Sequence, residues 1–148
     1  MGAAYRTADE ETSVGERDPF SIDPAIVERG LHSHAATQNA LAEFLKNKQL
    51  LPLSPAPNEP SYDIAWKLND NEIWIAEIKS VTNANEEKQL RLGLGQVLRY
   101  CQILKTKGKV HGILVIERAP SDLTWIDLCE AHNILLAWPE VFPSKIYV

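Results

Sequence analysis

The sequence has few cysteines and no long apolar run, and both absences narrow the classes of protein to which the chain can belong. Its two cysteines, Cys101 and Cys129, are too few and too far apart for a disulfide framework or a zinc site. No stretch is apolar for long enough to cross a membrane, so we expect no membrane partner. The sequence shows no signal peptide. We therefore expect a cytoplasmic protein with reduced thiols.

The chain also lacks an excess of positive charge. It carries 15 Lys and Arg against 20 Asp and Glu, which gives a formal net charge of −5. This balance argues against a protein that coats nucleic acid tightly and without specificity. It still allows a nuclease, because the basic residues of a nuclease need to line only one groove. The 148 residues suit one domain with a core of its own.

The N-terminal part of the chain divides into an arm and a helix. Residues 1–20 are polar and acidic, and they predict a flexible arm ahead of a single domain at 21–148. Asp23 as N-cap and Pro24 at the first position predict a helix over 24–48, which Gly30 can break or kink. Residues at helical spacing predict its inner stripe, which is Leu31, His34, Ala35, Gln38, Leu41, Ala42 and Leu45.

The rest of the domain alternates strands and helices. Asn69-Asp70-Asn71 suits the turn of a hairpin. Pro139 ends the last strand, and Ser121 is expected to cap the last helix. In chain order we expect a strand at 50–53, a proline-rich loop at 54–60, strands at 62–68 and 72–79, a polar loop at 80–85, a helix at 86–105, a strand at 110–116, a helix at 121–132 and a strand at 134–138. The order α-β-β-β-α-β-α-β predicts an α/β fold with a mixed central sheet flanked by helices.

Two carboxylates and a lysine stand out on the predicted hairpin. Asp63 lies near the start of its first strand, and Glu77-Ile78-Lys79 ends its second. Side chains alternate along a strand, so Glu77 and Lys79 point to one side and Ile78 points to the other. Charges at the inner end of an apolar strand are costly unless they are compensated. A Mg²⁺ ion, or Mn²⁺, would compensate the carboxylates, because it prefers oxygen ligands.

A divalent cation at this place would give the residues complementary roles. Asp63 and Glu77 would supply two oxygen ligands, and the carbonyl of Ile78 would supply a third. The cation would ease deprotonation of a water and stabilise charge on a phosphate. Lys79 would orient that water or offset the phosphoryl charge. The pattern thus predicts in-line hydrolysis of a phosphodiester, whereas a solvated Glu–Lys pair at a sheet edge would explain it without any function.

On these residues, the chain resembles the PD-(D/E)XK nuclease superfamily over roughly residues 30–137. The resemblance implies a restriction-endonuclease-like fold with an α-β-β-β-α-β core. It also implies a metal-dependent nuclease acting on DNA in restriction, repair, recombination or phage defence, with RNA left open as a substrate. The sequence departs from the motif at Tyr62, which stands directly before Asp63 where a proline is expected, with Pro60 just upstream.

The helix that follows the triplet carries a second motif. Gln96 and Tyr100 are four residues apart and share a helix face. They resemble the Gln-x-x-x-Tyr motif of the exonuclease branch of the superfamily, which implies that they lie near the site and contact nucleic acid or steady the catalytic groups. A core tyrosine with a surface glutamine is the alternative. Gly93 and Gly95 predict close approach of this helix to the sheet or to a phosphate backbone.

The first helix offers two rivals for a further site residue. Many members of the superfamily carry a Glu there, and Gln38 falls at the matching position. A glutamine is a poorer metal ligand, although it can still hydrogen-bond a water. His34 lies one turn earlier on the same stripe. The sequence leaves the choice between Gln38 and His34 open.

Candidates for contact with nucleic acid lie just after the triplet. Arg91 is the best of the basic ones, because a guanidinium can bind a phosphate bidentately, although a solvated helix face explains the same charges. The full set is Ser80, Lys88, Arg91 and Arg99.

The short chain leaves little room for a separate recognition domain. We therefore expect specificity from loops, from a homodimer or from a partner protein. The rival functions are a nuclease-like module that binds nucleic acid or assembles without cutting, and an unrelated α/β interaction domain.

Overall fold

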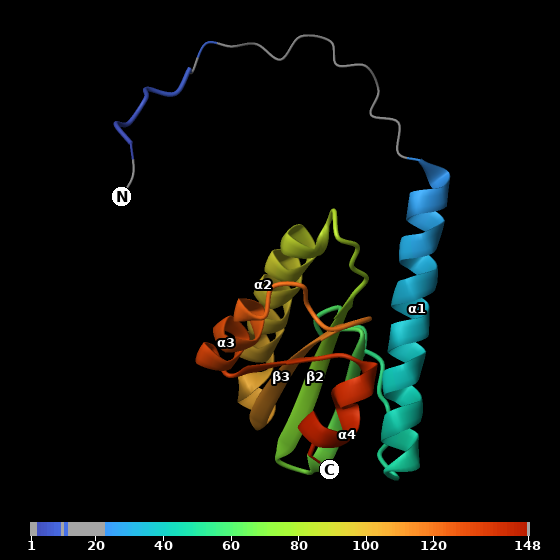
Figure 1. Cartoon of the computed structure of the whole chain (residues 1–148). Helices are drawn as coiled ribbons and strands as arrows, with labels where there is room; N and C mark the ends of the chain where they lie inside the picture. The colour runs from blue at the N-terminus through green and yellow to red at the C-terminus, as the bar shows by residue number, and fades with distance from the viewer. Residues whose placement is uncertain (1–2, 10, 12–22, 148) are drawn as a thin grey trace.

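The computed structural model describes residues 3–9, 11 and 23–147. Residues 23–147 form an α/β domain in which a mixed sheet lies between helices (Figure 1). Most of the predicted flexible arm at 1–20 lies outside the described residues, and its described part contains neither helix nor strand. No described helix combines the length and apolar character needed to cross a membrane.

Within the described residues, the sheet has four strands in the order β1-β2-β3-β4. β1 is antiparallel to β2, and the two remaining pairs are parallel. The helices and strands are α1 (Pro24–Asn47), β1 (Ile64–Asn69), β2 (Glu72–Lys79), α2 (Glu86–Leu104), β3 (Lys109–Ile116), α3 (Thr124–Ala131), β4 (Ile134–Ala137) and α4 (Phe142–Lys145). Short 3₁₀ turns occupy Lys105–Lys107 and Pro139–Val141. The predicted mixed sheet flanked by helices is confirmed.

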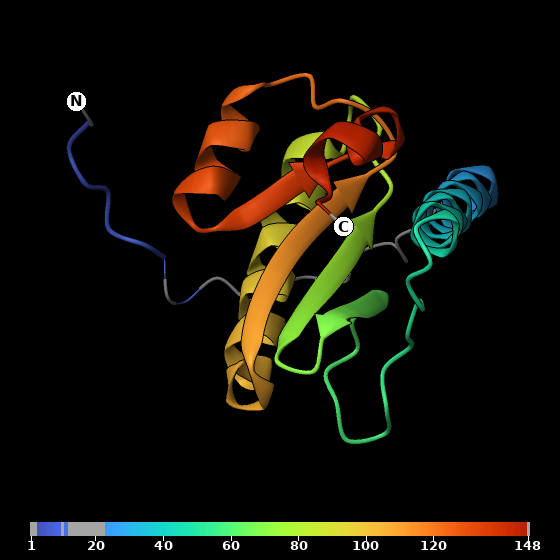
Figure 2. The same ribbon diagram turned by 90° about the horizontal axis from the view of Figure 1, so that it is seen from below.

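The two faces of the sheet are covered by different helices, as Figure 2 shows for α1 and α2 on opposite sides. Ala76 and Ile78 of β2 pack in a core cluster with residues of α1 and α4. Ile75 packs on the other face, in a cluster that includes Leu104 of α2. Because side chains alternate along a strand, Glu77 belongs to the α2 face.

The capping of α1 agrees with the sequence, whereas the predicted inner stripe is wrong at two of its seven residues. The Asp23 carboxylate accepts a hydrogen bond from the Ala25 amide at 2.9 Å, and the helix continues through Gly30 without a break. Leu31 is 68% exposed. Ala35 is exposed as well. The first turns of α1 lie beyond the ends of the strands, so they have no sheet to cover (Figure 1).

The expected strand at 50–53 is wrong. In its place the described structure has an isolated bridge between Leu53 and Ala65 of β1. Pro52 and Pro55 flank Leu53 and have no amide hydrogen, so a longer ladder cannot form there.

The start of α3 also differs from the prediction. The helix begins at Thr124, and Ser121 does not cap it. The Ser121 amide and hydroxyl instead donate to the buried Glu86 carboxylate, at 3.0 and 3.4 Å. Arg118 donates to the same carboxylate at 2.6 Å. The sequence pattern could not reveal this tertiary contact, because Glu86 is distant in the chain.

Candidate active site

The three residues of the predicted motif come together at the end of β2. Asp63 directly precedes β1, and its amide donates to the Ala76 carbonyl at 3.1 Å, so it lies beside the end of β2 that carries Glu77. The Asp63 carboxylate accepts a hydrogen bond from the Ile78 amide at 2.7 Å. The Lys79 ammonium forms an ion pair with Glu77 Oε1 at 2.8 Å. Local strand geometry therefore gathers two carboxylates and one cation, with a net charge of −1.

Both rivals on α1 reach Asp63, at different atoms. His34 Nε2 lies 3.3 Å from Asp63 Oδ2. Gln38 donates to the backbone carbonyl of Asp63 at 3.4 Å. The hydrogen bond to Asp63 raises the pKa of His34 above its usual value, and burial works in the opposite direction. The structure thus places His34 on the carboxylate and leaves Gln38 as a support for the backbone.

Glu77 is the most constrained acid of the site. Its side chain is almost completely buried, with the residue 4% exposed. Its Oε2 atom is buried and has no hydrogen-bond partner among the described residues. Burial raises the pKa of Glu77, the Asp63 charge raises it further, and Lys79 lowers it. A buried carboxylate oxygen without a partner is unfavourable, so this atom favours a cation or a proton as its neighbour.

Close packing of α2 against the sheet positions Lys79. A Cβ atom at Gly93 would come within 3.0 Å of Lys79 Cγ and 2.5 Å of Leu114 Cδ1. The missing side chain therefore lets the helix approach the lysine stem, as predicted for Gly93. Gly95 does not approach the sheet, since an added Cβ would meet open space there, and approach to a phosphate backbone stays a prediction.

Gln96 and Tyr100 lie on α2 beside the acidic pair. Gln96 Nε2 donates to the Tyr100 hydroxyl at 3.3 Å, while Gln96 Oε1 is buried without a partner among the described residues. Burial raises the pKa of Tyr100, and the charges of Glu77 and Asp63 raise it further. The two side chains therefore belong to the same electrostatic environment as the motif.

An open hollow of about 350 Å³ lies beside the site, and its lining includes His34 and Lys79 but neither carboxylate. Its walls come from the first turns of α1, the end of β2 and the start of α2. They are Ile26, Val27, Gly30, Leu31, His34, Lys79, Ser80, Asn85 and Gln89. Ser80, a predicted phosphate contact, is thus in the hollow with Lys79.

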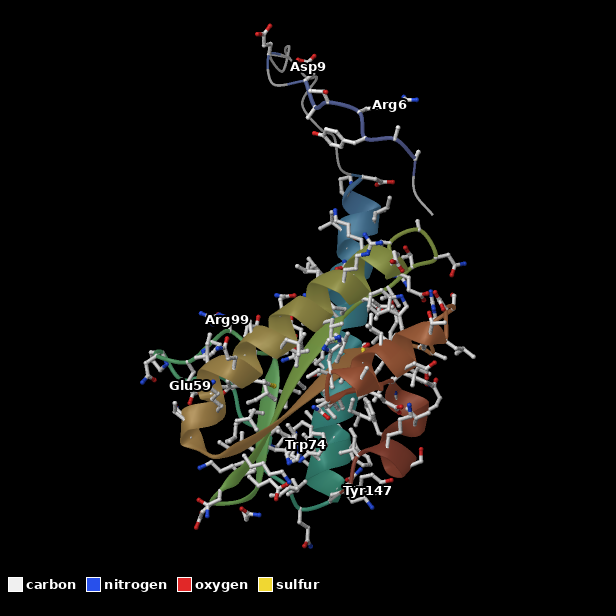
Figure 3. All side chains as sticks on the ribbon, turned by 90° about the vertical axis from the view of Figure 1, so that its left-hand side faces the viewer. Arg6, Asp9, Glu59, Trp74, Arg99 and Tyr147 are labelled. Carbon is white, nitrogen blue, oxygen red and sulfur yellow. The ribbon has the colours of Figure 1, made fainter. Side chains whose placement is uncertain are left out.

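The three basic candidates on α2 are arranged differently. Lys88 and Arg99 are exposed, and Arg99 donates to Gln102 at 3.0 Å on the outer surface of α2 (Figure 3). Arg91 forms an ion pair with Glu87 at 2.9 Å. It lines a separate hollow against α3. The structure therefore does not bring Arg91 to the acidic pair.

The described residues contain no group of three or more His, Cys, Asp and Glu side chains arranged to hold a metal ion. A metal at the motif would therefore use the two carboxylates of Asp63 and Glu77 together with the main chain. The Ile78 amide points to Asp63. Its carbonyl faces the same neighbour, because both groups of a strand residue point to the same side. The donor set and the unpartnered Glu77 oxygen fit an oxygen-preferring cation that keeps several waters.

One polar cluster that fixes α1 was not predicted from the sequence. Glu117 directly follows β3 and accepts hydrogen bonds from the Ser33 hydroxyl, Arg29 and the Val81 amide. These contacts tie α1 and the chain after β2 to the end of β3. The sequence signal for this cluster was an acid directly after a buried strand. Because β2 and β3 are parallel, Glu117 lies at the same end of the sheet as the end of β2.

The comparisons add no relative. No family model, curated protein or solved structure matches the chain. The interpretation of the site consequently depends on its geometry and chemistry.

Proposed function

We propose that this protein is a metal-dependent nuclease of the PD-(D/E)XK type, with a restriction-endonuclease-like fold and DNA as its substrate. The observation that carries the proposal is the buried Glu77 Oε2, which has no partner among the described residues and belongs to a side chain whose pKa the nearby Asp63 charge raises. A purely structural Glu–Lys pair would not need a second acid beside it, because like charges repel.

Each residue of the site has a chemical role in this proposal. Asp63, Glu77 and the Ile78 carbonyl would hold Mg²⁺ or Mn²⁺. Such an ion lowers the pKa of a water and offsets charge on a phosphate. Lys79 has three N–H donors and uses one on Glu77, so others can hydrogen-bond a phosphoryl oxygen or the attacking water. His34 holds the Asp63 carboxylate in place.

The decisive test is cleavage of linear, circular, single-stranded and branched DNA, and of RNA, in Mg²⁺ and in Mn²⁺. We expect the wild type to cleave, and Lys79→Ala to reduce the rate by about 100-fold or more, because a transition-state contact is lost. Lys46→Ala is the matched control, since Lys46 lies on the surface of α1 in an exposed ion pair with Glu43. Cleavage that survives in both Lys79→Ala and Asp63→Ala would contradict the proposal.

A second candidate function is a nuclease-like module that binds nucleic acid or assembles with a partner without cutting. The absence of a third acidic or histidine ligand in the described residues favours it. The acidic net charge of −5 also argues for such a module. Metal binding in the wild type without cleavage of any substrate would support this module over the enzyme.

A further inference from the structure

A second cavity lies along the hairpin, separate from the hollow beside Lys79. Its volume is about 320 Å³, at the lower end of the range of about 300–1,000 Å³ for pockets that hold small ligands. It is bounded by β1, β2, the chain at 53–62 and the end of α2. Its lining is Leu53, Ser54, Glu59, Tyr62, Ala65, Lys67, Asp70, Ile73, Ile75, Leu104 and Lys107.

The floor of this cavity continues the strand pairs that carry the acids. The register pairs Ala65 with Ile75, and Glu77 lies two residues beyond Ile75 on β2. Residues two apart on a strand point to the same face and lie about 7 Å apart. The apolar floor therefore begins about 7 Å from Glu77, on the same sheet face. One nucleotide can span this distance, with its phosphate at the acidic end and its base on the apolar floor.

The wall of the cavity is held in place before any ligand arrives. The Glu59 carboxylate accepts hydrogen bonds from Lys107 at 2.7 Å, Tyr62 at 2.6 Å and the Ala56 amide at 3.0 Å. Figure 3 places Glu59 beside the C-terminal end of α2. The Lys107 contact fastens the loop before β1 to the 3₁₀ turn that follows α2. A preformed wall lowers the entropy cost of binding.

The rim of the cavity carries polar groups that are available to a ligand. Lys67 and Asp70 are exposed. Both side chains belong to the lining of the cavity. An ammonium can donate to the ring nitrogens and carbonyls of a base, and a carboxylate can accept from its amino group. The apolar floor suits the face of a base, and the rim suits its edge.

We propose that this cavity binds an unstacked base of the substrate strand, next to the phosphate that is cut. The inference rests on the proposed nuclease function and deepens it, because it assigns the substrate class. The base must leave the stack of a duplex to enter, so the favoured substrate is single-stranded or has an unpaired base beside the cut. Tyr62 supplies the aromatic surface of the lining, and Ala65 and Ile75 supply the aliphatic surface.

The test uses short DNA single strands in which one base is 2-aminopurine, whose fluorescence rises when it leaves the base stack. Binding is measured without divalent cations, so that the strand stays intact. We expect the fluorescence to rise at one position of the label with the wild type. Ser54→Trp, which fills the mouth of the cavity, should abolish the rise and weaken binding by about tenfold or more. Ser144→Trp, on the surface of α4, should leave both unchanged.

A second variant covers the case in which Ser54→Trp does not fold. Lys67→Ala should reduce the rise and the affinity, and Lys48→Ala, at the C-cap of α1, should not. The proposal is overturned if no strand binds, if no label position responds, or if the cavity variants behave like the wild type.

Cleavage of the same strands in Mg²⁺ separates the two proposals. A fluorescence rise that depends on Ser54, without cleavage, would retain the base pocket and contradict the nuclease. If neither Ser54→Trp nor an abasic site at any position changes the cleavage rate, the nuclease proposal stands and the base-pocket proposal is wrong.

Discussion

Glu59 is the residue whose ionisation the structure constrains most clearly. The hydrogen bond from Lys107 is the largest cause, followed by those from Tyr62 and the Ala56 amide, and together they lower its pKa to about 2. A carboxyl group whose pKa is lower in the folded protein stabilises the fold when it is ionised. Its contribution is therefore complete above the unfolded pKa of about 4.5 and is lost as the pH falls toward 2.

We predict that Glu59→Gln destabilises the protein by about 1 kcal/mol at pH 7, a value reduced by solvent screening. The difference from the wild type should shrink between pH 4.5 and pH 2, because the wild-type carboxyl group then becomes protonated. Urea unfolding at several pH values measures the difference. The exposed Glu43 is the control, and Glu43→Gln should change stability by less than about 0.5 kcal/mol. A pH-independent effect of Glu59→Gln would show that charge is not its cause.

At this scale, strand alternation predicted that Glu77 and Lys79 point to one side of their strand, and the hairpin predicted that Asp63 comes near them. Short-range geometry determines these positions, so the sequence contains the needed information. It does not determine which atom of Asp63 each side chain of α1 reaches, because that depends on the packing of a helix against the sheet. The sequence could not choose between His34 and Gln38 for this reason.

Among the elements, α2 offers a matched pair of glycines. Alanine at either position gains helix propensity, which is about 1 kcal/mol per glycine replaced. At Gly95 nothing opposes this gain, since the space is open. At Gly93 the new methyl group would press on Leu114, which is fully buried and cannot move freely.

We predict that Gly95→Ala stabilises the protein by about 1 kcal/mol. Gly93→Ala should be less stable than Gly95→Ala by about 1–3 kcal/mol, because it overpacks the contact with the sheet. Thermal and urea unfolding of both variants give the comparison. Because Lys79 shares the contact, the Gly93→Ala variant should also cleave more slowly than the wild type. Equal stability of the two variants would mean that α2 does not approach the sheet closely at Gly93.

The elements themselves show where sequence patterns suffice. The hairpin, α2 and the buried β3 have strong periodicity and lie within one or two residues of their predicted positions. The strand at 50–53 fails because the prolines beside Leu53 outweigh its apolar character. Leu31 has the spacing of an inner residue, yet it is exposed, because spacing cannot reveal where the sheet under a helix ends.

For the whole molecule, a bound cation should couple the site to global stability. A ligand that binds only the folded state adds about 2.7 kcal/mol when its concentration is 100 times its Kd. For a domain of this size, each kcal/mol of added stability raises the Tm by about 2–4 °C. We predict that Mg²⁺ or Mn²⁺ raises the Tm of the wild type, and that EDTA reverses the rise.

The acidic variants provide the control for this prediction. Glu77→Gln and Asp63→Asn should each lose most of the rise, since each removes a charged oxygen ligand. Glu43→Gln should keep it, because Glu43 lies on the surface of α1, away from the motif. A rise of equal size in all four proteins would assign the effect to nonspecific binding of cations and not to the motif.

The bridge between Leu53 and Ala65 has a consequence for the behaviour of the protein at high concentration. β1 is at an edge of the sheet, where free backbone groups invite strands of other molecules to pair. Leu53 occupies part of that edge through two hydrogen bonds of 2.7 and 2.9 Å. The flanking prolines cannot donate to a further strand, so the segment caps the edge without creating a new one. The proline-rich loop therefore covers part of the sheet edge at β1, and we expect its deletion to leave that edge open to pairing.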